Sequence, residues 1–392
     1  MTIPIPAVKR VTINNYRGIG EVSLELHPIT IFVGRNNTGK SSIVEAIALV
    51  LSSSQGFKDI VDKRDLMKHV AGLRDGYEHL VKRGSNICEI EAELSYRSDV
   101  KNIKMTMATH EGFSELPDNI RSVILSFIDE IAVERVEAKR RRFISYFYES
   151  RALREEESGE EIVRAVEEEV ESLKKGIILS IISQVNGEIS HLRLVTYIDA
   201  HLLKEYDKAY RRFYFPVHAR LVGYRLSRSA IDELEVDLQV KVIEELRKII
   251  PYFWDYRNGR VIFRYGDKSE ITSLGSTGEG FQAVLDLLTP IIVGARVIII
   301  EEPENHMHPG LMERYTSVML DSLTQGVQYI ITTHSLELLE LLLDTASQKE
   351  LLDYVSIIRT YRMPDGDVDY EILKGKEALE ELSEIGGDLR GP

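Results

Sequence analysis

The chain has 392 residues, of which 43% are hydrophobic and 29% charged, a composition that indicates a folded protein of two or three domains and excludes global disorder. Its 63 acidic residues outnumber its 49 lysines and arginines, and the resulting net charge of -14 argues against non-specific coating of nucleic acid or anionic lipid. The single cysteine, Cys88, excludes an intramolecular disulfide and a Cys-x-x-Cys metal site. Because there is neither a run of about 20 apolar residues nor a signal-like N-terminus, we expect a cytoplasmic protein with no membrane partner.

The N-terminal segment predicts three short strands: Val8–Asn14, Val22–Leu26 and the fully apolar run Ile29–Val33. A glycine-bounded loop, residues 34–41, comes next. It leads into a helix whose apolar face carries Ile43, Val44, Ile47, Ala48 and Leu51. Strand, loop and helix in this order provide the context that a phosphate-binding loop requires.

The middle of the chain, residues 53–269, reads as a large, mostly helical insertion. Its strand candidates are isolated: Ile87–Tyr96, Lys101–Ala108 and Leu192–Ile198. Its most helical parts are Ile131–Ile182 and Ser229–Ile250, the second of which is ended by Pro251. Heptads do not persist, so the pattern predicts at most a short helical arm and no lengthy coiled coil.

Continuous apolar runs return near the C-terminus, at Val297–Ile300, Val327–Ile331 and Val355–Arg359, separated by helical segments. Such runs are typical of a buried parallel sheet. We therefore expect the two ends, residues 1–52 and 270–392, to build one discontinuous α/β head around a single sheet. A turn at Asp365-Gly366 and a last helix, Lys376–Ile385, complete the chain.

The loop at residues 34–41 matches G-x-x-x-x-G-K-[ST] at every fixed position. Its backbone N–H groups and the helix N-terminus favour bound phosphates, Lys40 would reach the outer phosphates of ATP, and the Ser41 hydroxyl would ligate Mg²⁺. The predicted nucleotide contacts are Asn36, Asn37, Thr38, Gly39, Lys40, Ser41 and Ser42.

Two adjacent acids, Glu301 and Glu302, follow the apolar run at residues 297–300. Two carboxylates at a buried strand end are costly unless chemistry requires them. We assign Glu301 to the metal and Glu302 to the general base that activates water. The alternative is a strand that simply runs into an acidic, solvated loop.

Two further segments are weak signals when taken alone. The small-residue stretch that contains Ser276, Gly278 and Glu279 opens an apolar helix and could bind an anion or merely cap the helix. His334 follows an apolar strand and could contact the γ-phosphate, although a lone histidine is more often structural.

In order along the chain, Lys40, Ser276, Glu302 and His334 resemble the Walker A loop, signature loop, Walker B strand and H-loop of the ABC-type ATPases. Within that class the chain resembles the OLD (overcoming lysogenization defect) family and its RecF- and SMC-type relatives. The segments that carry this resemblance are residues 13–19, 34–42, 215–220 and 301–309.

The resemblance implies an ATP-dependent head-to-tail homodimer, in which Ser276 and Gly278 of one subunit contact the γ-phosphate held by the other and Asn305 faces the partner. Two departures stand out: Glu301 occupies a position where Asp is usual, and Gly-Ser-Thr-Gly-Glu replaces the common Leu-Ser-Gly-Gly-Gln. Gln55 is a candidate for the Q-loop glutamine.

Full-length OLD nucleases carry a Toprim domain after the ATPase, whereas only 58 residues follow His334 here, so we expect no such domain. The alternating acids Asp365, Asp367, Asp369 and Glu371 read as a solvated strand face and not as a nuclease metal cluster. There is no zinc hook.

Two functions remain open. The first is an ATPase whose dimerisation drives a DNA-related process, repair or anti-phage defence, with a separately encoded effector. Basic runs at residues 139–143 and 211–215 would contact DNA, or else serve ion-pair networks. The second is a slow or non-hydrolysing ATP-gated dimer whose acidic segment, residues 155–171, suits a basic protein partner. A kinase or GTPase would explain neither the signature loop nor the H-loop.

Overall fold

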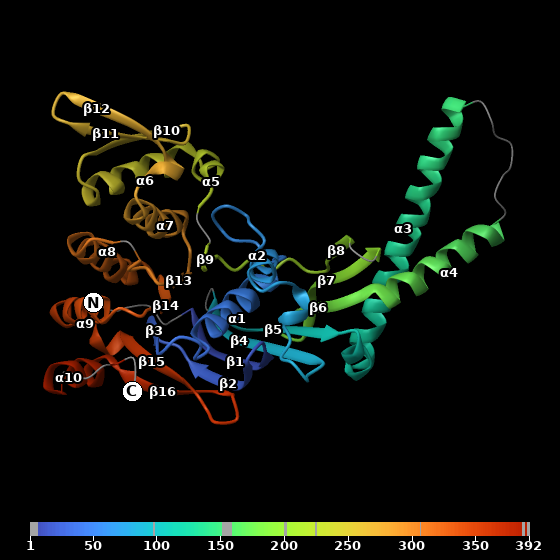
Figure 1. Cartoon of the computed structure of the whole chain (residues 1–392), viewed down its shortest axis with the longest axis horizontal. Helices are drawn as coiled ribbons and strands as arrows, with labels where there is room; N and C mark the ends of the chain where they lie inside the picture. Colours follow the sequence, from blue (N-terminus) through green and yellow to red (C-terminus); the bar gives the residue numbers. More distant parts are fainter. Residues whose placement is uncertain are drawn as a thin grey trace.

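The computed structural model describes residues 7–96, 99–150, 159–199, 202–223, 226–305, 307–385 and 389, which form three sheets with flanking helices (Figure 1). A six-stranded sheet holds the predicted phosphate-binding loop. Its strands follow the order β16-β15-β3-β14-β13-β9. Their bounds are β3 Ile29–Val33, β9 Val217–Arg220, β13 Val297–Glu301, β14 Gln328–Thr332, β15 Val355–Arg362 and β16 Val368–Lys374.

Five neighbouring strands of this sheet are parallel, and β16 joins β15 as an antiparallel hairpin. Every residue of β3, β13 and β14 is buried, which explains why these strands read as continuous apolar runs. Because the strands are parallel, the segments that follow β3, β13 and β14 emerge at one edge of the sheet.

A second, antiparallel sheet has seven strands in the order β2-β1-β4-β5-β6-β7-β8. The bounds are β1 Val8–Tyr16, β2 Ile19–Glu25, β4 Ile87–Tyr96, β5 Asp99–Thr109, β6 Ile177–Val185, β7 Glu188–Asp199 and β8 Leu202–Ala209. The prediction that the two chain ends share one sheet is correct for β3 and β13–β16 and wrong for β1 and β2. Strand β1 pairs with β4 of the middle segment, and β2 pairs with β1 at the edge of that second sheet. The division of the chain into a head, residues 1–52 with 270–392, and an insertion, residues 53–269, stays a proposal. Two sheets contain strands from both parts: the seven-stranded sheet includes β1 and β2, and the six-stranded sheet includes β9.

Helix α1, Lys40–Ser53, lies between these two sheets, packing on β1, β4 and β5 on one side and on β9, β13 and β14 on the other. Thirteen of its fourteen residues are buried for this reason. The nearby short helix α2, Leu66–Leu73, packs on α1.

A helical arm formed by α3, Asp118–Ser150, and α4, Gly159–Gly176, projects from the seven-stranded sheet (Figure 1). The sequence pattern allowed a short helical arm, and the structure has an arm whose longer helix has 33 residues. The helix predicted to reach Ile182 is wrong. The run from Ile177 is rich in β-branched residues and forms β6, which pairs with β5 and β7. Part of the acidic segment at residues 155–171 lies outside the described residues.

The remaining strands form a small sheet of β10 Phe253–Arg257, β11 Arg260–Tyr265 and β12 Lys268–Ser273, beside α5 Arg228–Asp232 and α6 Val236–Ile249. The single helix predicted for residues 229–250 is two helices, because Gln239 Nε2 donates to the backbone oxygens of Asp232 and Leu234 at the break. Three further helices complete the fold together with α7 Glu279–Val293: α8 Pro309–Ser322, α9 Leu336–Gln348 and α10 Gly375–Ile385.

Candidate functional site

The phosphate-binding loop connects β3 to α1, as the sequence predicts. Gly34 and Gly39 adopt φ angles of 141° and 95°, which side-chain-bearing residues rarely adopt. A Cβ at Gly39 would also lie 2.7 Å from a methyl carbon of Val368. Asn36 and Asn37 are exposed on the outer side of the loop. Thr38 is buried, and its hydroxyl lies 2.8 Å from that of Thr360.

The Lys40 ammonium group lies inside the loop, where it donates to the backbone oxygens of Gly34 and Arg35, both at 2.8 Å. Burial lowers the pKa of Lys40 to about 8, and the nearby carboxylates of Glu302 and Glu301 act in the opposite direction. The loop therefore holds one cation close to the two acids at the end of β13.

Glu301 is the last residue of β13 and is only 7% exposed. Its Oε2 accepts the backbone N–H of Val222 at 2.6 Å, while its Oε1 is buried without a hydrogen-bond partner among the described residues. Burial raises the pKa of Glu301 to about 7, and the Ser41 hydroxyl lowers it. A buried carboxylate oxygen without a partner, beside a serine hydroxyl, is a donor set that fits Mg²⁺.

Glu302 has a left-handed backbone, φ 47°, which turns the chain away from β13. Its carboxylate accepts the Asn305 side-chain N–H at 2.7 Å and lies 3.6 Å from His334 Nε2. The structure thus brings His334, at the end of β14, to the acid predicted as the general base. Asn305 is itself exposed, and its hydrogen bond holds the Glu302 carboxylate of the same chain.

Glu304 lies beside these residues, although no role was predicted for it from the sequence. Its Oε1 accepts both the Thr333 hydroxyl at 2.6 Å and the His334 backbone N–H at 3.0 Å. These bonds fix the turn between β14 and α9 against the loop after β13. Its place in the run Glu301-Glu302-Pro303-Glu304 is the only signal in the sequence.

A second unpredicted group lies beneath Ser41. Glu45, one helical turn later on α1, is completely buried and pairs with the guanidinium groups of Arg17 and Arg74. Arg17 lies in the turn between β1 and β2, and Arg74 directly follows α2. The start of α1 is therefore anchored by ion pairs to the seven-stranded sheet and to α2.

The loop is also held from the β15–β16 hairpin. Arg362 donates to the backbone oxygens of Asn37 at 2.9 Å and Gly18 at 2.8 Å. The hairpin acids have structural partners: Asp367 accepts Gly20 N–H and Lys82, Asp369 accepts the Tyr361 hydroxyl, and Glu371 pairs with Arg359. Among the described residues no group of three or more His, Cys, Asp or Glu side chains is placed so that it could hold a metal ion.

The predicted signature loop lies in a different part of the structure. Ser276 ends a short 3₁₀ turn after β12, is exposed, and has its hydroxyl 2.7 Å from that of Ser273. Gly278 is the N-cap of α7 and Glu279 is its first residue. The Ser276 hydroxyl thus contacts a residue of its own loop.

Gln55 is poorly placed to be the Q-loop glutamine. It follows the C-terminal end of α1, and a 14-residue helix spans about 20 Å. Its side chain donates to the backbone oxygens of Phe215 at 2.9 Å and Lys58 at 3.1 Å. The residue that does contact the acid at the end of β13 is Val222, which lies in the segment between β9 and α5 and donates its backbone N–H to Glu301.

The fold and this set of side chains define an ABC-type P-loop ATPase head. The chain belongs to the family described as "AAA domain, putative AbiEii toxin, Type IV TA system", which matches residues 29–340. Among the described residues, no helix combines the length and apolar character needed to span a membrane.

Three relatives are similar over parts of the chain. The uncharacterized protein MJECL11 of Methanocaldococcus jannaschii is 32% identical over 118 residues, 29% of this chain and 99% of that protein. MJECL10 of the same organism is 51% identical over 51 residues, 13% of this chain and 23% of that protein. The DNA replication and repair protein RecF of Colwellia psychrerythraea is 27% identical over 121 residues, 31% of this chain and 30% of its own length.

Solved structures of Smc heads also match. The SmcHead bound to the C-winged helix domain of ScpA has a TM-score of 0.49 at 13% identity, covering 96% of this chain and all of that one. The Smc head domain derived from Pyrococcus furiosus, bound to the C-terminal domain of ScpA, has a TM-score of 0.47 at 14% identity, covering 98% of this chain and 100% of that one.

Proposed function

We propose that this protein is a Mg²⁺-dependent ATPase that forms an ATP-sandwiched homodimer. The observation that carries the proposal is the meeting of Lys40, Ser41, Glu301, Glu302 and His334 at the ends of three adjacent parallel strands, β3, β14 and β13. A lysine in a phosphate-binding loop, a hard-oxygen metal site, and a carboxylate beside a histidine are the parts that phosphoryl transfer to water requires.

The roles follow from position. Loop N–H groups and Lys40 would bind the phosphates, while Ser41 and Glu301 would hold Mg²⁺, which supplies charge neutralisation on the outer phosphates. Glu302 would accept a proton from the attacking water as the oxygen forms its bond to phosphorus. Asn305 and His334 hold the Glu302 carboxylate in place, and Glu304 holds the His334 backbone.

The exposed Ser276 and Gly278 support a composite site, since their own subunit's contacts leave them at the surface. In this arrangement they close on ATP held by the partner subunit, with Glu279 at the positive end of α7. ATP then joins two surfaces, and hydrolysis releases them.

We further propose an OLD-type role in a DNA-related process, repair or anti-phage defence, with a separately encoded effector. This part rests on the quoted sequence motifs and on the RecF similarity. The competing candidate, a slow ATP-gated module that docks a basic protein, is favoured by the exposed carboxylates Glu160, Glu161, Glu167, Glu168 and Glu171 on α4.

The test is the solution mass of Glu302→Gln by light scattering, with and without ATP and Mg²⁺, alone and with duplex DNA. We expect ATP to convert monomer to dimer. Lys40→Ala is the matched control, because it keeps the fold and loses the ATP contact. An ATP-independent mass in Glu302→Gln would contradict the sandwich, and normal ATP turnover by this variant would remove Glu302 as the base.

A further inference from the structure

A second cavity, of about 760 Å³, lies at the opposite end of α1 from the phosphate-binding loop. Three parts of the chain line it: the segment after α1, strands β7 and β8, and the segment between β8 and β9. The lining residues that matter here are Lys58, Lys63, Lys68, Asp65, Arg193, Asp207, Arg211, Arg212, Phe213 and Tyr214.

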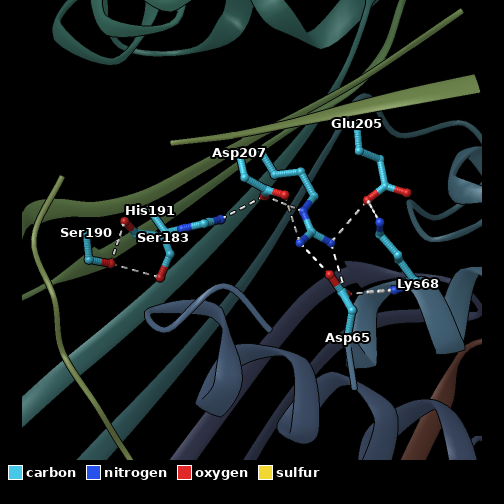
Figure 2. A network of polar contacts seen from close by, with 8 residues as sticks. Asp65, Lys68, Ser183, Ser190, His191, Glu205 and Asp207 are labelled. Carbon is cyan, nitrogen blue, oxygen red and sulfur yellow. Dashed lines mark hydrogen bonds and ion pairs between the residues drawn. The ribbon is translucent and has the colours of Figure 1, made fainter. Parts of the chain in front are cut away.

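The floor of the cavity is a built ionic network. Arg193 is only 2% exposed, and its guanidinium donates to Asp65 at 3.0 and 2.6 Å and to Asp207 at 2.7 Å. Three acids pair with this guanidinium: Asp65 from the N-cap of α2, and Glu205 and Asp207 from β8. Figure 2 shows these three side chains pointing toward one another. The floor is therefore rigid, and its charges largely compensate one another.

The network continues to the end of α1. His191 Nε2 lies 3.0 Å from Asp207, and the hydroxyl of the preceding residue, Ser190, lies 3.3 Å from that of Ser183 (Figure 2). The Ser183 hydroxyl also lies 2.7 Å from that of Ser53. Ser53 is the last residue of α1. The cavity floor is thus connected to the end of α1 through the adjacent β7 residues Ser190 and His191.

The rim, in contrast, is cationic. Lys58, Lys63, Arg211 and Arg212 are exposed, and Glu188 is the carboxylate that pairs with Arg211. These five groups, together with the exposed Lys68 and the ionic network of Arg193, Asp65, Glu205 and Asp207, comprise six cations and four carboxylates. The result is a local excess of two positive charges on a chain whose net charge is -14. A local excess of this sign indicates a polyanionic ligand.

Aromatic rings lie beside the rim cations. Tyr214 is 51% exposed, and Phe213 is partly buried against the core. Cations next to an accessible ring are the combination that binds a nucleic-acid strand, with phosphates on the cations and a base stacked on the ring. The volume falls within the range of about 300–1,000 Å³ for ligand pockets and admits unpaired nucleotides, whereas a duplex keeps its bases stacked inside and is far too wide.

We propose that this cavity binds single-stranded nucleic acid, with Lys58, Arg212 and Tyr214 as principal contacts. The choice of ligand rests on the proposed DNA-related function. Two segments connect the site to ATP: α1 runs from Ser41 to the cavity, and residues 211–216 lead into β9, after which Val222 contacts Glu301. Strand binding is therefore expected to change ATP turnover.

The test is fluorescence anisotropy of a labelled 20-nucleotide oligo-dT with the full chain, without nucleotide and with ATP and Mg²⁺. Lys58→Gln with Arg212→Gln should weaken binding about tenfold and reduce the slope of log affinity against log salt by about 1.4, because each lost phosphate contact on a single strand removes about 0.7. Tyr214→Leu should also weaken binding about tenfold.

Two matched controls lie outside the cavity. Tyr210→Leu removes an exposed ring that faces Lys208, and Lys139→Gln with Arg140→Gln neutralises the other basic run, on α3; both should bind the strand within twofold of the unaltered chain. Binding of a fluorescent ATP analogue is measured in parallel, so failure of the ATP site is seen separately.

Three results would overturn the proposal: oligo-dT binding by the cavity variants at the unaltered affinity, loss of binding in the α3 variant instead, or competition by dAMP at the same concentration as the oligonucleotide. If the full chain binds ATP and dimerises but binds no strand, the cavity assignment fails while the ATPase proposal stands.

Discussion

Arg220 Nε lies 3.0 Å from a carboxylate oxygen of Asp286, and this ion pair joins the end of β9 to α7, the helix that follows the proposed signature loop. Both side chains are largely buried, at 14% and 3% exposure. Two residues after Arg220, Val222 donates to Glu301. The acid proposed to bind metal and the helix α7 are therefore connected through one short segment.

The first prediction concerns this ion pair. Asp286→Asn should leave ATP affinity within twofold, lower ATP turnover at least tenfold and reduce stability by about 3–5 kcal/mol, because it leaves a buried guanidinium without its charge partner. The double variant Arg220→Met with Asp286→Leu should recover most of the thermal stability but not turnover. Recovery of both would show that the pair serves stability alone.

Lys40→Ala should lose nucleotide binding by at least about a hundredfold, since the loop then lacks its only ammonium group near the outer phosphates. Titration with a fluorescent ATP analogue measures this directly. Lys241→Ala, which changes an exposed lysine on α6, is the control and should bind as the unaltered chain does. Equal affinities in the two variants would remove Lys40 from the site.

Ser276→Arg should bind ATP normally and fail to dimerise, because its bulk enters the partner's site. Mixing it with Lys40→Ala offers a sharper test: one subunit then supplies an intact phosphate-binding loop and the other an intact signature loop. Light scattering should detect ATP-dependent dimers in the mixture but in neither variant alone. Dimers of Ser276→Arg alone would contradict the composite site.

Glu304→Ala should reduce turnover about tenfold with little change in ATP affinity, because the His334 backbone and the Thr333 hydroxyl lose their shared acceptor. Glu304→Gln keeps a carbonyl acceptor for both bonds and should retain most of the activity. Steady-state phosphate release compares kcat and KM for the two variants. If both variants lose turnover equally, the negative charge of Glu304 matters and not its two hydrogen bonds.

The fifth prediction is a pH dependence of stability. His218 and Asp59 are fully buried with Nδ1 2.9 Å from Oδ2, and the ion pair raises the pKa of His218 above 6.5 and lowers the pKa of Asp59 below 3.8. The His218 contribution is complete below pH 6.5 and is lost as pH rises through the raised pKa, while the Asp59 contribution is lost as pH falls below about 4.

Thermal unfolding between pH 6 and pH 9 measures the first of these effects. The unaltered chain should lose stability across this range, and His218→Gln should be less stable at pH 6 with a flatter profile. An unchanged slope in His218→Gln would assign the pH dependence to another group.

The sequence by itself determined the phosphate-binding loop, the strand that ends in Glu301 and Glu302, and the His334 turn. Each is a local pattern of strand, loop and helix within about 15 residues, and burial on both faces of a parallel sheet makes such strands continuously apolar. The turn predicted at Asp365-Gly366, which joins β15 to β16, and the predicted last helix are also local patterns, and both are confirmed.

Only the tertiary structure decided which sheet each strand joins and which charges meet. Strands β1 and β2 alternate in the manner of any half-buried strand, so the pairing of β1 with β4, which places this hairpin in the second sheet, is set by long-range register. The pairs Arg220–Asp286 and Arg193–Asp65 join residues 66 and 128 positions apart among 49 basic and 63 acidic side chains. No local pattern selects one such pair from so many, because only the packed core brings their charges within a few ångströms.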